Sequence, residues 1–384
     1  MSPTPVSMSD PTAPAGYTWE ATSEQVSARY GVPLDRIVRF DLNTSPEPPE
    51  LAARILAGGR FETSLSEYPP SDYRQLTAAA AERYGVPAEE ILVGAGADEI
   101  LDIAAKTFLP PGGTAVIPTP SYAMYRVLTE QRPARVRAVP RLGSADGYAI
   151  DLELTRTTAR RADLIWLCSP NNPTARAEPE GAIARLLAEL AADAERDGRS
   201  APVVVLDEAY AEYTGTSLLP LRSDFPGLIV VRTLSKAYAL AGLRVGFGIA
   251  ARRMIAAMEP FRPPGSVSTV SVTLATAALR DGSIVDRAVE RVSSERERLS
   301  AALGAAGWPV GTSDANFVLI RFDSSEGAAA AAEGLLRRGL VPRTFPSTHP
   351  LADHLRLTVR SPDEDDRLIA AATDLRDERR EGRP

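Results

Sequence analysis

Lysine is the residue type in this chain whose position says most about chemistry, because it is so rare. Of 43 basic residues only Lys106 and Lys236 are lysines, and the others are arginines. A position that keeps lysine is a candidate for what arginine cannot do, which is to lose a proton and attack a carbonyl. Lys106 lies in a helical pattern with no comparable neighbours, so we interpret it as a surface residue. Lys236 is the candidate nucleophile.

The surroundings of Lys236 favour this interpretation over an ordinary surface lysine. It stands in TLSKAYALAGLRVGF, residues 233–247, directly after an apolar run that is typical of a strand. The ends of parallel strands are where α/β folds bind their ligands. Ser235 precedes the lysine, and Arg244 follows eight positions later. The positive charge of Arg244 could lower the pKa of Lys236 or hold a phosphate.

Two other apolar runs also end in polar residues. In VVVLDEAYAEY, Asp207 ends the run and Tyr210 follows. A buried carboxylate needs a partner, and a protonated pyridine nitrogen would suit it, although Asp207 could instead cap a following helix. In DLIWLCSPNNPTA, Asn172 lies in a turn where its amide could donate to an ionised ring oxygen. Asn-Asn-Pro is also an ordinary turn signal.

Two weaker candidates lie nearer the N-terminus. The loop GAGADE, residues 94–99, precedes a helix, and the free amides of Ala97 and Asp98 would form an anion site at its start. Such turns are common, and Asp98 could serve only the helix dipole. Tyr122, in PTPSYAMY, could stack on a pyridine ring or belong to the core.

These segments fall on an alternating pattern of elements. We expect strands at 90–93, 114–117, 135–139, 163–168, 202–206, 228–232 and 245–249, and helices at 72–84, 97–108, 121–130 and 178–196. After the large domain we expect helices at 268–280, 283–303, 326–338 and 363–376 and strands at 316–322 and 354–359. Strands that are apolar on both faces indicate a mainly parallel sheet covered by helices. The predicted fold class is α/β, with a smaller α+β domain after the sheet.

The chain length suggests about two domains. We expect an N-terminal arm over 1–45, flexible to about residue 16, with a short helix at 23–30 and packing against the small domain. A large domain would cover 46–262, and a small C-terminal domain would cover 263–384.

Composition excludes several classes of function. The net charge of -7 and the pI near 5.2 argue against a nucleic-acid partner. No apolar run is long enough to span a membrane, and the N-terminus lacks a signal-peptide core, so we expect a cytoplasmic protein. The single cysteine, Cys168, is interpreted as a small buried hydrophobe. With only two histidines, His349 and His354, neither a metal centre nor a Ser-His-Asp triad is expected.

Taken in order, a set of motifs resembles the fold-type I pyridoxal 5'-phosphate (PLP) enzymes of aminotransferase class I/II. The motifs are SEYPPSD, GADE, PSYAMY, CSPNNPT, VVLDEAY, TLSKAYALAGLRVGF and LRLTV. They look most like the histidinol-phosphate aminotransferase family, and the resemblance runs from about Tyr17 to Asp374. It implies transamination with PLP, histidinol phosphate as amino donor, and 2-oxoglutarate and glutamate as the partner pair. It also implies a homodimer with shared active sites.

The resemblance further implies a role for each candidate residue. Lys236 would hold PLP as a Schiff base and serve as general base, with Asp207 at the pyridine nitrogen. Asn172 and Tyr210 would hold the 3'-oxygen, Tyr122 would stack on the ring, and Ala97, Asp98, Ser235 and Arg244 would bind the phosphate. Tyr68 would reach the cofactor phosphate of the partner subunit. Arg356 would clamp the substrate carboxylate, and Tyr17 and Arg343 could contact a substrate phosphate.

The chain departs from the family pattern at three places. The family's Asn-Glu-Asn-Pro loop is Asn43-Thr44-Ser45-Pro46 here, and two expected glycines are Ala175 and Arg360. The cofactor set stays complete, so we expect the departures to touch the substrate side. Two other enzymes remain as alternatives, an O-phosphothreonine decarboxylase and an aromatic amino acid aminotransferase. A non-enzymatic PLP-sensing module is less favoured, because the N-terminus offers no basic DNA-binding segment.

Overall fold

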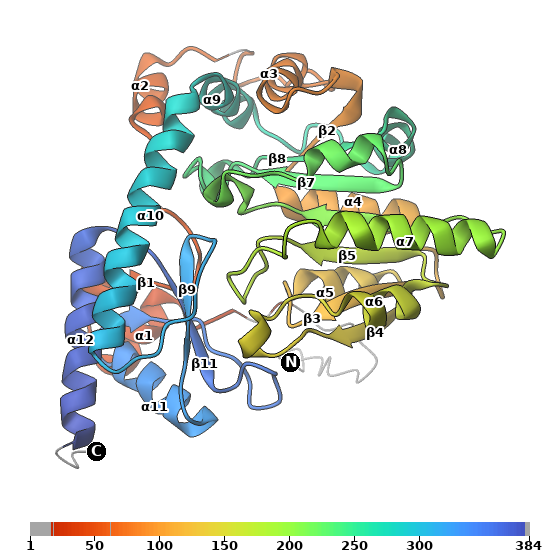
Figure 1. The fold of residues 1–384 in the computed structure, drawn as a ribbon. Helices are drawn as coiled ribbons and strands as arrows, with labels where there is room; N and C mark the ends of the chain where they lie inside the picture. Colours follow the sequence, from red (N-terminus) through yellow and green to blue (C-terminus); the bar gives the residue numbers. More distant parts are fainter. Residues whose placement is uncertain (1–16, 18, 62, 381–384) are drawn as a thin grey trace, which may run out of the picture.

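The computed structural model describes residues 17, 19–61 and 63–380. A layered sheet with helices on both faces fills one part of the molecule, and a smaller group of helices around two strands stands beside it (Figure 1). The predicted α/β class with a mainly parallel sheet is confirmed. The expectation of a flexible arm over residues 1–16 falls outside the described residues.

A seven-stranded sheet forms the centre of the larger part, in the order β2-β8-β7-β6-β5-β3-β4. Its strands are β2 (Ile91–Gly94), β3 (Thr114–Thr119), β4 (Arg135–Pro140), β5 (Leu164–Cys168), β6 (Val203–Asp207), β7 (Leu228–Thr233) and β8 (Gly246–Ala250). The strands from β7 to β4 are parallel, whereas β8 runs antiparallel to both β2 and β7. The carboxyl ends of the parallel strands therefore lie at one edge, where such folds bind ligands.

The central strands are apolar on both faces because both faces are covered. In β6, Val205 belongs to one hydrophobic cluster, and its neighbours Val204 and Leu206 belong to the other. Strand β7 alternates in the same way, with Ile229 on one side and Val230 on the other. Successive side chains of a strand point to opposite faces, so burial on both faces gives a continuous apolar run.

Helices cover the two faces of the sheet. They are α3 (Arg74–Tyr84), α4 (Ala97–Phe108), α5 (Met124–Gln131), α6 (Leu152–Ala159), α7 (Ala182–Arg196) and α8 (Arg252–Met258). Apolar residues of α4, α5 and α8 share one cluster with Val205 and Ile229, while α6 and α7 contribute to the cluster on the opposite face. Helices α2 (Glu50–Gly58) and α9 (Thr269–Arg280) pack together with α3 at one end of the molecule (Figure 1).

The smaller part is built around the antiparallel strands β9 (Phe317–Arg321) and β11 (His354–Thr358). Its helices are α10 (Gly282–Ala305), α11 (Ser325–Leu336) and α12 (Pro362–Arg380). The N-terminal segment joins it, because β1 (Val38–Arg39) pairs in parallel with β10 (Leu340–Val341), and α1 (Ser23–Tyr30) precedes β1. Domain boundaries at residues 45 and 262 stay a prediction.

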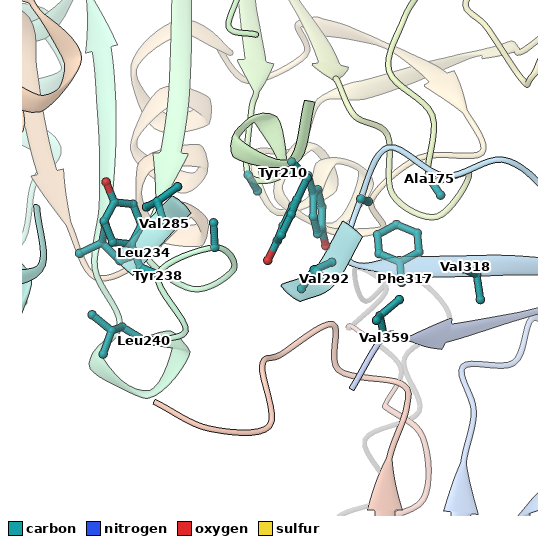
Figure 2. Close-up of a cluster of buried hydrophobic side chains, with 14 of the residues drawn as sticks. Ala175, Tyr210, Leu234, Tyr238, Leu240, Val285, Val292, Phe317, Val318 and Val359 are labelled. Atoms are coloured by element: carbon teal, nitrogen blue, oxygen red, sulfur yellow. The ribbon is translucent and has the colours of Figure 1, made fainter. Parts of the chain in front are cut away.

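The two parts meet through buried aromatic and apolar side chains. Figure 2 shows Tyr210 of the larger part beside Phe317 and Val359 of the smaller part. The rings of Tyr210 and Phe317 meet edge to face with their centroids 5.3 Å apart. This contact fixes Tyr210 against the smaller part, and it lies close to the sheet edge that carries the site.

Several element starts differ from the prediction for physical reasons. The helix expected from residue 72 begins at Arg74, because Tyr73 has a left-handed backbone with φ of 44°. The helix expected from 178 begins at Ala182, after Gly181 with φ of 73°. The short helices α2, α6 and α8 were not expected from the sequence. Within the described ranges, no helix has the length and apolar character that a membrane crossing requires.

Candidate active site

A cavity of about 680 Å³ opens at the carboxyl edge of the sheet, between the larger and the smaller part. Segments far apart in the sequence line it: the N-terminal residues 17 and 19, the loop 41–44, the start of α4, the segments after β5, β6 and β7, and the smaller part. Apart from Tyr68, every predicted site residue lines this cavity: Tyr17, Ala97, Asp98, Tyr122, Asn172, Asp207, Tyr210, Ser235, Lys236, Arg244, Arg343 and Arg356. The fold therefore gathers the candidates in one place.

Lys236 follows β7 and projects its amine into this cavity. Its Nζ donates to the main-chain oxygen of Asn43 at 3.1 Å and lies 5.6 Å from the centre of the Tyr210 ring. Burial, with help from the charge of Arg356, lowers the pKa of Lys236 to about 8. Loss of water around an ammonium group favours the neutral amine, which is the nucleophilic form.

Asp207 is the last residue of β6 and is buried. It accepts a hydrogen bond from the Tyr125 hydroxyl at 2.8 Å and one from the main-chain N–H of Ala209 at 3.0 Å. Burial nevertheless raises the pKa of Asp207 to about 6. Two neutral donors do not replace the water that this carboxylate has lost, so a cationic partner in the cavity would stabilise it.

The start of α4 is shaped for close approach of an anion. Gly96, which precedes the helix, has φ of 84°, and a Cβ there would lie 2.7 Å from a guanidinium nitrogen of Arg244. A Cβ at Gly246 would lie 2.5 Å from the main-chain nitrogen of Ala97. The two glycines therefore let Arg244 and the first amides of α4 face one space, as anion sites at helix starts require. Asp98, on the first turn, pairs with Arg244 at 3.2 Å.

Tyr210 and Asn172 are both fixed by contacts from other segments. The Tyr210 hydroxyl accepts from the side-chain amide of Asn43 at 3.0 Å. The Asn172 side-chain oxygen accepts from Arg356 at 2.6 Å, which leaves its amide nitrogen to point elsewhere. Tyr122 donates its hydroxyl to Asp98 at 3.0 Å, so its ring is held at the cavity wall.

Arg356, on β11, is a buried guanidinium without an acidic partner in the part of the chain described. Besides Asn172, it donates to the main-chain oxygen of Asp41, and its Nε has no hydrogen-bond partner among these residues. A buried cation that lacks a counter-ion is costly. A carboxylate or phosphate entering the cavity would complete this site, and a guanidinium binds either group with two parallel hydrogen bonds.

A second arginine stands next to Arg356. Arg343 and Arg356 pair as backbone neighbours, with N–H···O distances of 3.0 and 3.1 Å in the two directions. The Arg343 guanidinium lies over the Tyr17 ring, 5.5 Å from its centre, and 3.7 Å from Glu20. Trp19, which is 70 % exposed, meets Tyr17 edge to face at 4.8 Å. The outer part of the cavity is therefore aromatic and cationic.

Tyr68, Ala175 and Arg360 lie outside the wall of this cavity. Tyr68 is 89 % exposed and does not line the cavity of its own chain, so its predicted role toward a partner subunit is not tested. Two of the departures from the family pattern lie outside the cavity wall, so their predicted effect on the substrate side stays a prediction. Ala175 and Arg360 are not among the lining residues, and Arg360 pairs with Glu364 instead. Ala175 has φ of 65°, which explains the glycine expected there.

Some lining or supporting residues were not predicted. Asn43 stood out only as part of a variant loop, and its contacts with Lys236 and Tyr210 could not be foreseen. Tyr125, in the first turn of α5, follows Tyr122 by three residues, and their rings meet edge to face with centroids 5.6 Å apart. Nothing in the sequence pointed to Trp19 except that it lies two positions after Tyr17.

The comparisons with known proteins agree with this geometry. Residues 44–371 match the family described as aminotransferase class I and II. A histidinol-phosphate aminotransferase of Symbiobacterium thermophilum is 36% identical over 341 residues, which are 88% of this chain and 90% of that protein. One from Pyrococcus furiosus is 33% identical over 345 residues, 89% of this chain and 94% of that protein.

Solved structures agree as well. The histidinol-phosphate aminotransferase of Sinorhizobium meliloti in complex with PLP superimposes with a TM-score of 0.81 at 25% identity, covering 94% of this chain and 96% of that one. Aspartate aminotransferase from Thermus thermophilus with maleate shares the fold, with a TM-score of 0.73 at 24% identity, covering 93% and 97%. The chain belongs to the class I and II aminotransferases. It is a PLP-dependent transaminase that acts on small amino and oxo acids.

Proposed function

We propose that this aminotransferase uses histidinol phosphate as amino donor and the pair 2-oxoglutarate and glutamate as its second couple. The observation that carries the proposal is the pair of neighbouring arginines at the cavity: Arg356, which has no acidic partner among the residues that the structure describes, and Arg343 at the aromatic outer end. Such a site would accept substrates that carry two anionic groups or one anion and a flat ring. The relatives named histidinol-phosphate aminotransferase support the same choice.

The residues of the inner cavity fit PLP. Lys236 offers a half-buried amine of lowered pKa to its aldehyde. Asp207 is a buried carboxylate with no cationic partner in direct contact among residues 17, 19–61 and 63–380, and the pyridine nitrogen would supply one. The amides of Ala97 and Asp98, with Ser235 and Arg244, would hold the phosphate, and Asn172 and Tyr210 would hold the ring oxygen. Tyr122 would cover the ring.

The protein's own part in the chemistry is proton movement and orientation. When bound, PLP supplies an aldehyde for the amino group and a ring that withdraws electrons from the carbon carrying it. The amine of Lys236 would take the proton from that carbon, since its lowered pKa leaves a usable fraction neutral near pH 7. Asp207 would keep the ring nitrogen protonated. Both groups are held by hydrogen bonds, so little reorganisation is needed.

The substrate side must serve two different molecules in turn. The carboxylate of glutamate would bind the two-pronged guanidinium of Arg356. Arg343 and Tyr17 would contact the phosphate of histidinol phosphate, or the second carboxylate of glutamate. The aromatic rings of Trp19 and Tyr17 would face the imidazole. This arrangement would let one site accept both partners of a ping-pong exchange.

A homodimer is part of the proposal. Tyr68, at 89 % exposure, lies beside Gly265, and Leu65 of the same segment is 65 % exposed, so neighbouring large apolar side chains here would be covered by a partner. We propose that it contacts the cofactor phosphate of the partner subunit. Sedimentation of the PLP-loaded protein tests the assembly, and mixed dimers of Tyr68→Ala and Lys236→Ala chains test the shared site.

A single-turnover screen tests the substrate. The PLP-loaded protein is mixed with histidinol phosphate, an aromatic amino acid, glutamate or O-phosphothreonine, and conversion of the bound cofactor to pyridoxamine phosphate is followed by absorbance. We expect histidinol phosphate and glutamate to react fastest. Preference for the aromatic amino acid would reassign the donor. Release of carbon dioxide from O-phosphothreonine in the absence of an oxo acid would show that the enzyme is a decarboxylase and not a transaminase of a phosphate ester.

A further inference from the structure

Asn43 connects four segments of this site. Its main-chain oxygen accepts from Lys236 Nζ at 3.1 Å and from the side-chain amide of Asn316 at 3.0 Å. Its side-chain amide donates to the Tyr210 hydroxyl at 3.0 Å, and its main-chain N–H donates to the Thr358 hydroxyl at 2.9 Å. Its side-chain oxygen lies 3.3 Å from the same Thr358 hydroxyl. The partners of this buried residue therefore lie on four different segments of the chain.

The backbone at Asn43 is held in an unusual conformation. Its φ is 53°, in the left-handed region that residues other than glycine seldom adopt, although asparagine tolerates it best. This conformation turns the main-chain oxygen toward Lys236 while the side chain reaches Tyr210. Strain of this kind persists only where the surroundings over-determine it, as the four hydrogen bonds do here.

We propose that Asn43 is a positioning residue for the transamination, holding the free amine of Lys236 by its main-chain oxygen and the hydroxyl of Tyr210 by its side-chain amide. The inference rests on the proposed function, because it takes Lys236 as the reacting lysine. An oxygen acceptor at a fixed place orients the lysine Nζ within the cavity. The amide occupies an oxygen lone pair of Tyr210, so the hydroxyl hydrogen stays available to donate into the cavity.

The same residue connects Lys236 and Tyr210 to β11, the strand that carries Arg356. Thr358 lies two positions after Arg356 on β11, and its hydroxyl both accepts from the N–H of Asn43 and donates to the Phe40 oxygen at 2.7 Å. Asn316 immediately precedes β9, the strand that pairs with β11. A shift of β11 when an anion binds Arg356 would therefore reach Lys236 through Asn43.

The experiment compares two substitutions at this position. Asn43→Gly keeps a residue that adopts positive φ and keeps the main-chain oxygen, but it removes the amide. Asn43→Ala removes the same amide and also disfavours the left-handed backbone, so the oxygen should move. The two variants thus separate the backbone contact with Lys236 from the side-chain contact with Tyr210.

Lys236 is followed in cofactor-free protein by competitive labelling with trace acetic anhydride across pH and by peptide mapping. Because the chain has only two lysines, Lys106 serves as the reference in every sample. An acceptor oxygen favours the ammonium form, so its loss should lower the midpoint of Lys236 labelling. We expect the labelling midpoint of Lys236 to fall by about one pH unit in Asn43→Ala and to stay unchanged in Asn43→Gly. The labelling midpoint of Lys106 should be the same in every sample.

The side-chain contact is read from the PLP-loaded protein without substrate. The visible absorption of bound PLP changes with pH, and the midpoint of that change should rise by the same several tenths of a pH unit in both variants. Both variants lack the Asn43 amide, and its hydrogen bond makes the Tyr210 hydroxyl a stronger donor. An unchanged absorption midpoint would remove the Tyr210 half of the proposal. An Asn43→Ala midpoint for Lys236 equal to that of Asn43→Gly would remove the backbone half.

A second variant keeps the test decisive if Asn43→Ala does not fold. Thr358→Val removes the acceptor of the Asn43 N–H at nearly constant volume, and it should lower the Lys236 midpoint by a smaller amount. No shift in this variant would overturn the link to β11. Failure of the proposed function looks different, since PLP would then not protect Lys236 of the unmodified protein from labelling.

Discussion

The two walls of the cavity are built in different ways. On the inner wall, Asp207 ends β6, and Asn172 and Lys236 follow the ends of the adjacent parallel strands β5 and β7 by four and three residues, so the strands set where these short segments begin. On the outer wall, residues from the N-terminus, the loop 41–44 and the smaller part meet only through tertiary contacts. The inner wall is therefore fixed by the sheet, and the outer wall is fixed by the packing of distant segments.

This difference suits the inner wall to catalysis and the outer wall to substrate recognition. Groups on the sheet edge keep their geometry when loops change, so they suit steps that tolerate little displacement. Groups on loops can be replaced without harming the sheet, so they suit recognition. Substitutions on the inner wall should accordingly reduce turnover, and substitutions on the outer wall should change substrate affinity.

The largest effect is expected at Lys236. Lys236→Ala removes the amine that we assign to proton transfer, and turnover should fall by about 10³- to 10⁴-fold or more. Lys106→Ala is the matched control, because Lys106 makes only a half-exposed pair with Asp102. Steady-state rates with glutamate measure both. Comparable losses in the two variants would mean that the inner wall has been assigned to the wrong lysine.

The next largest effect is expected at Asp207, where a substitution should lower turnover but raise the stability of the cofactor-free protein. Asp207→Asn should lower turnover by at least about 10²-fold, because a neutral amide cannot hold the ring nitrogen protonated. The same change should stabilise the cofactor-free protein. Burial raises the pKa of Asp207 to about 6, so the charged form costs the folded state about 2–3 kcal/mol above that pH and nothing below its ordinary pKa.

Thermal unfolding of the cofactor-free Asp207→Asn variant checks the sign. Its Tm should exceed that of the unmodified protein at pH 8, and the two should converge as the pH falls below about 4. A Tm gain that is the same at every pH would show that the buried charge is not its source.

A smaller and more selective effect is expected on the outer wall. Arg356→Lys replaces a planar two-pronged donor by a point charge, and KM for glutamate, whose carboxylate we assign to Arg356, should rise by about 10-fold or more. Arg343→Lys should raise KM mainly for the phosphate ester. Cofactor affinity should stay constant in both, which equilibrium dialysis of PLP measures. A loss of PLP affinity in either variant would contradict the assignment of the outer wall to substrate binding alone.

The inner wall could be predicted from the sequence because each of its residues follows an apolar run of strand length. The runs before Asp207 and Lys236 gave both the element and the edge at which it ends. Gly96 and Arg244 are brought together by β8, whose antiparallel direction the sequence did not reveal.

The outer wall could be predicted only through family resemblance, and its contacts could not be predicted at all. Arg356 binds Asn172 across 184 positions of sequence, and no local pattern encodes such a pair. The left-handed backbone of Asn43 is held by partners in four other segments, so its role could not be predicted without them. The short helices α2, α6 and α8 were missed because their apolar stripes are too brief to show a period.

The smallest effect is expected at Trp19, where the outer wall meets solvent. Trp19→Phe keeps an aromatic ring against Tyr17, whereas Trp19→Ala removes it, so KM for histidinol phosphate should rise about 2- to 5-fold in the alanine variant only. The indole is also its own probe. Trp166 and Trp308 are buried, so the change of tryptophan emission on substrate binding should come mainly from exposed Trp19 and should vanish in Trp19→Phe. An emission change that survives in Trp19→Phe would place the substrate away from this part of the outer wall. A fall in kcat of Trp19→Ala as large as that of Asp207→Asn would contradict the claim that the inner wall sets turnover and the outer wall sets substrate affinity.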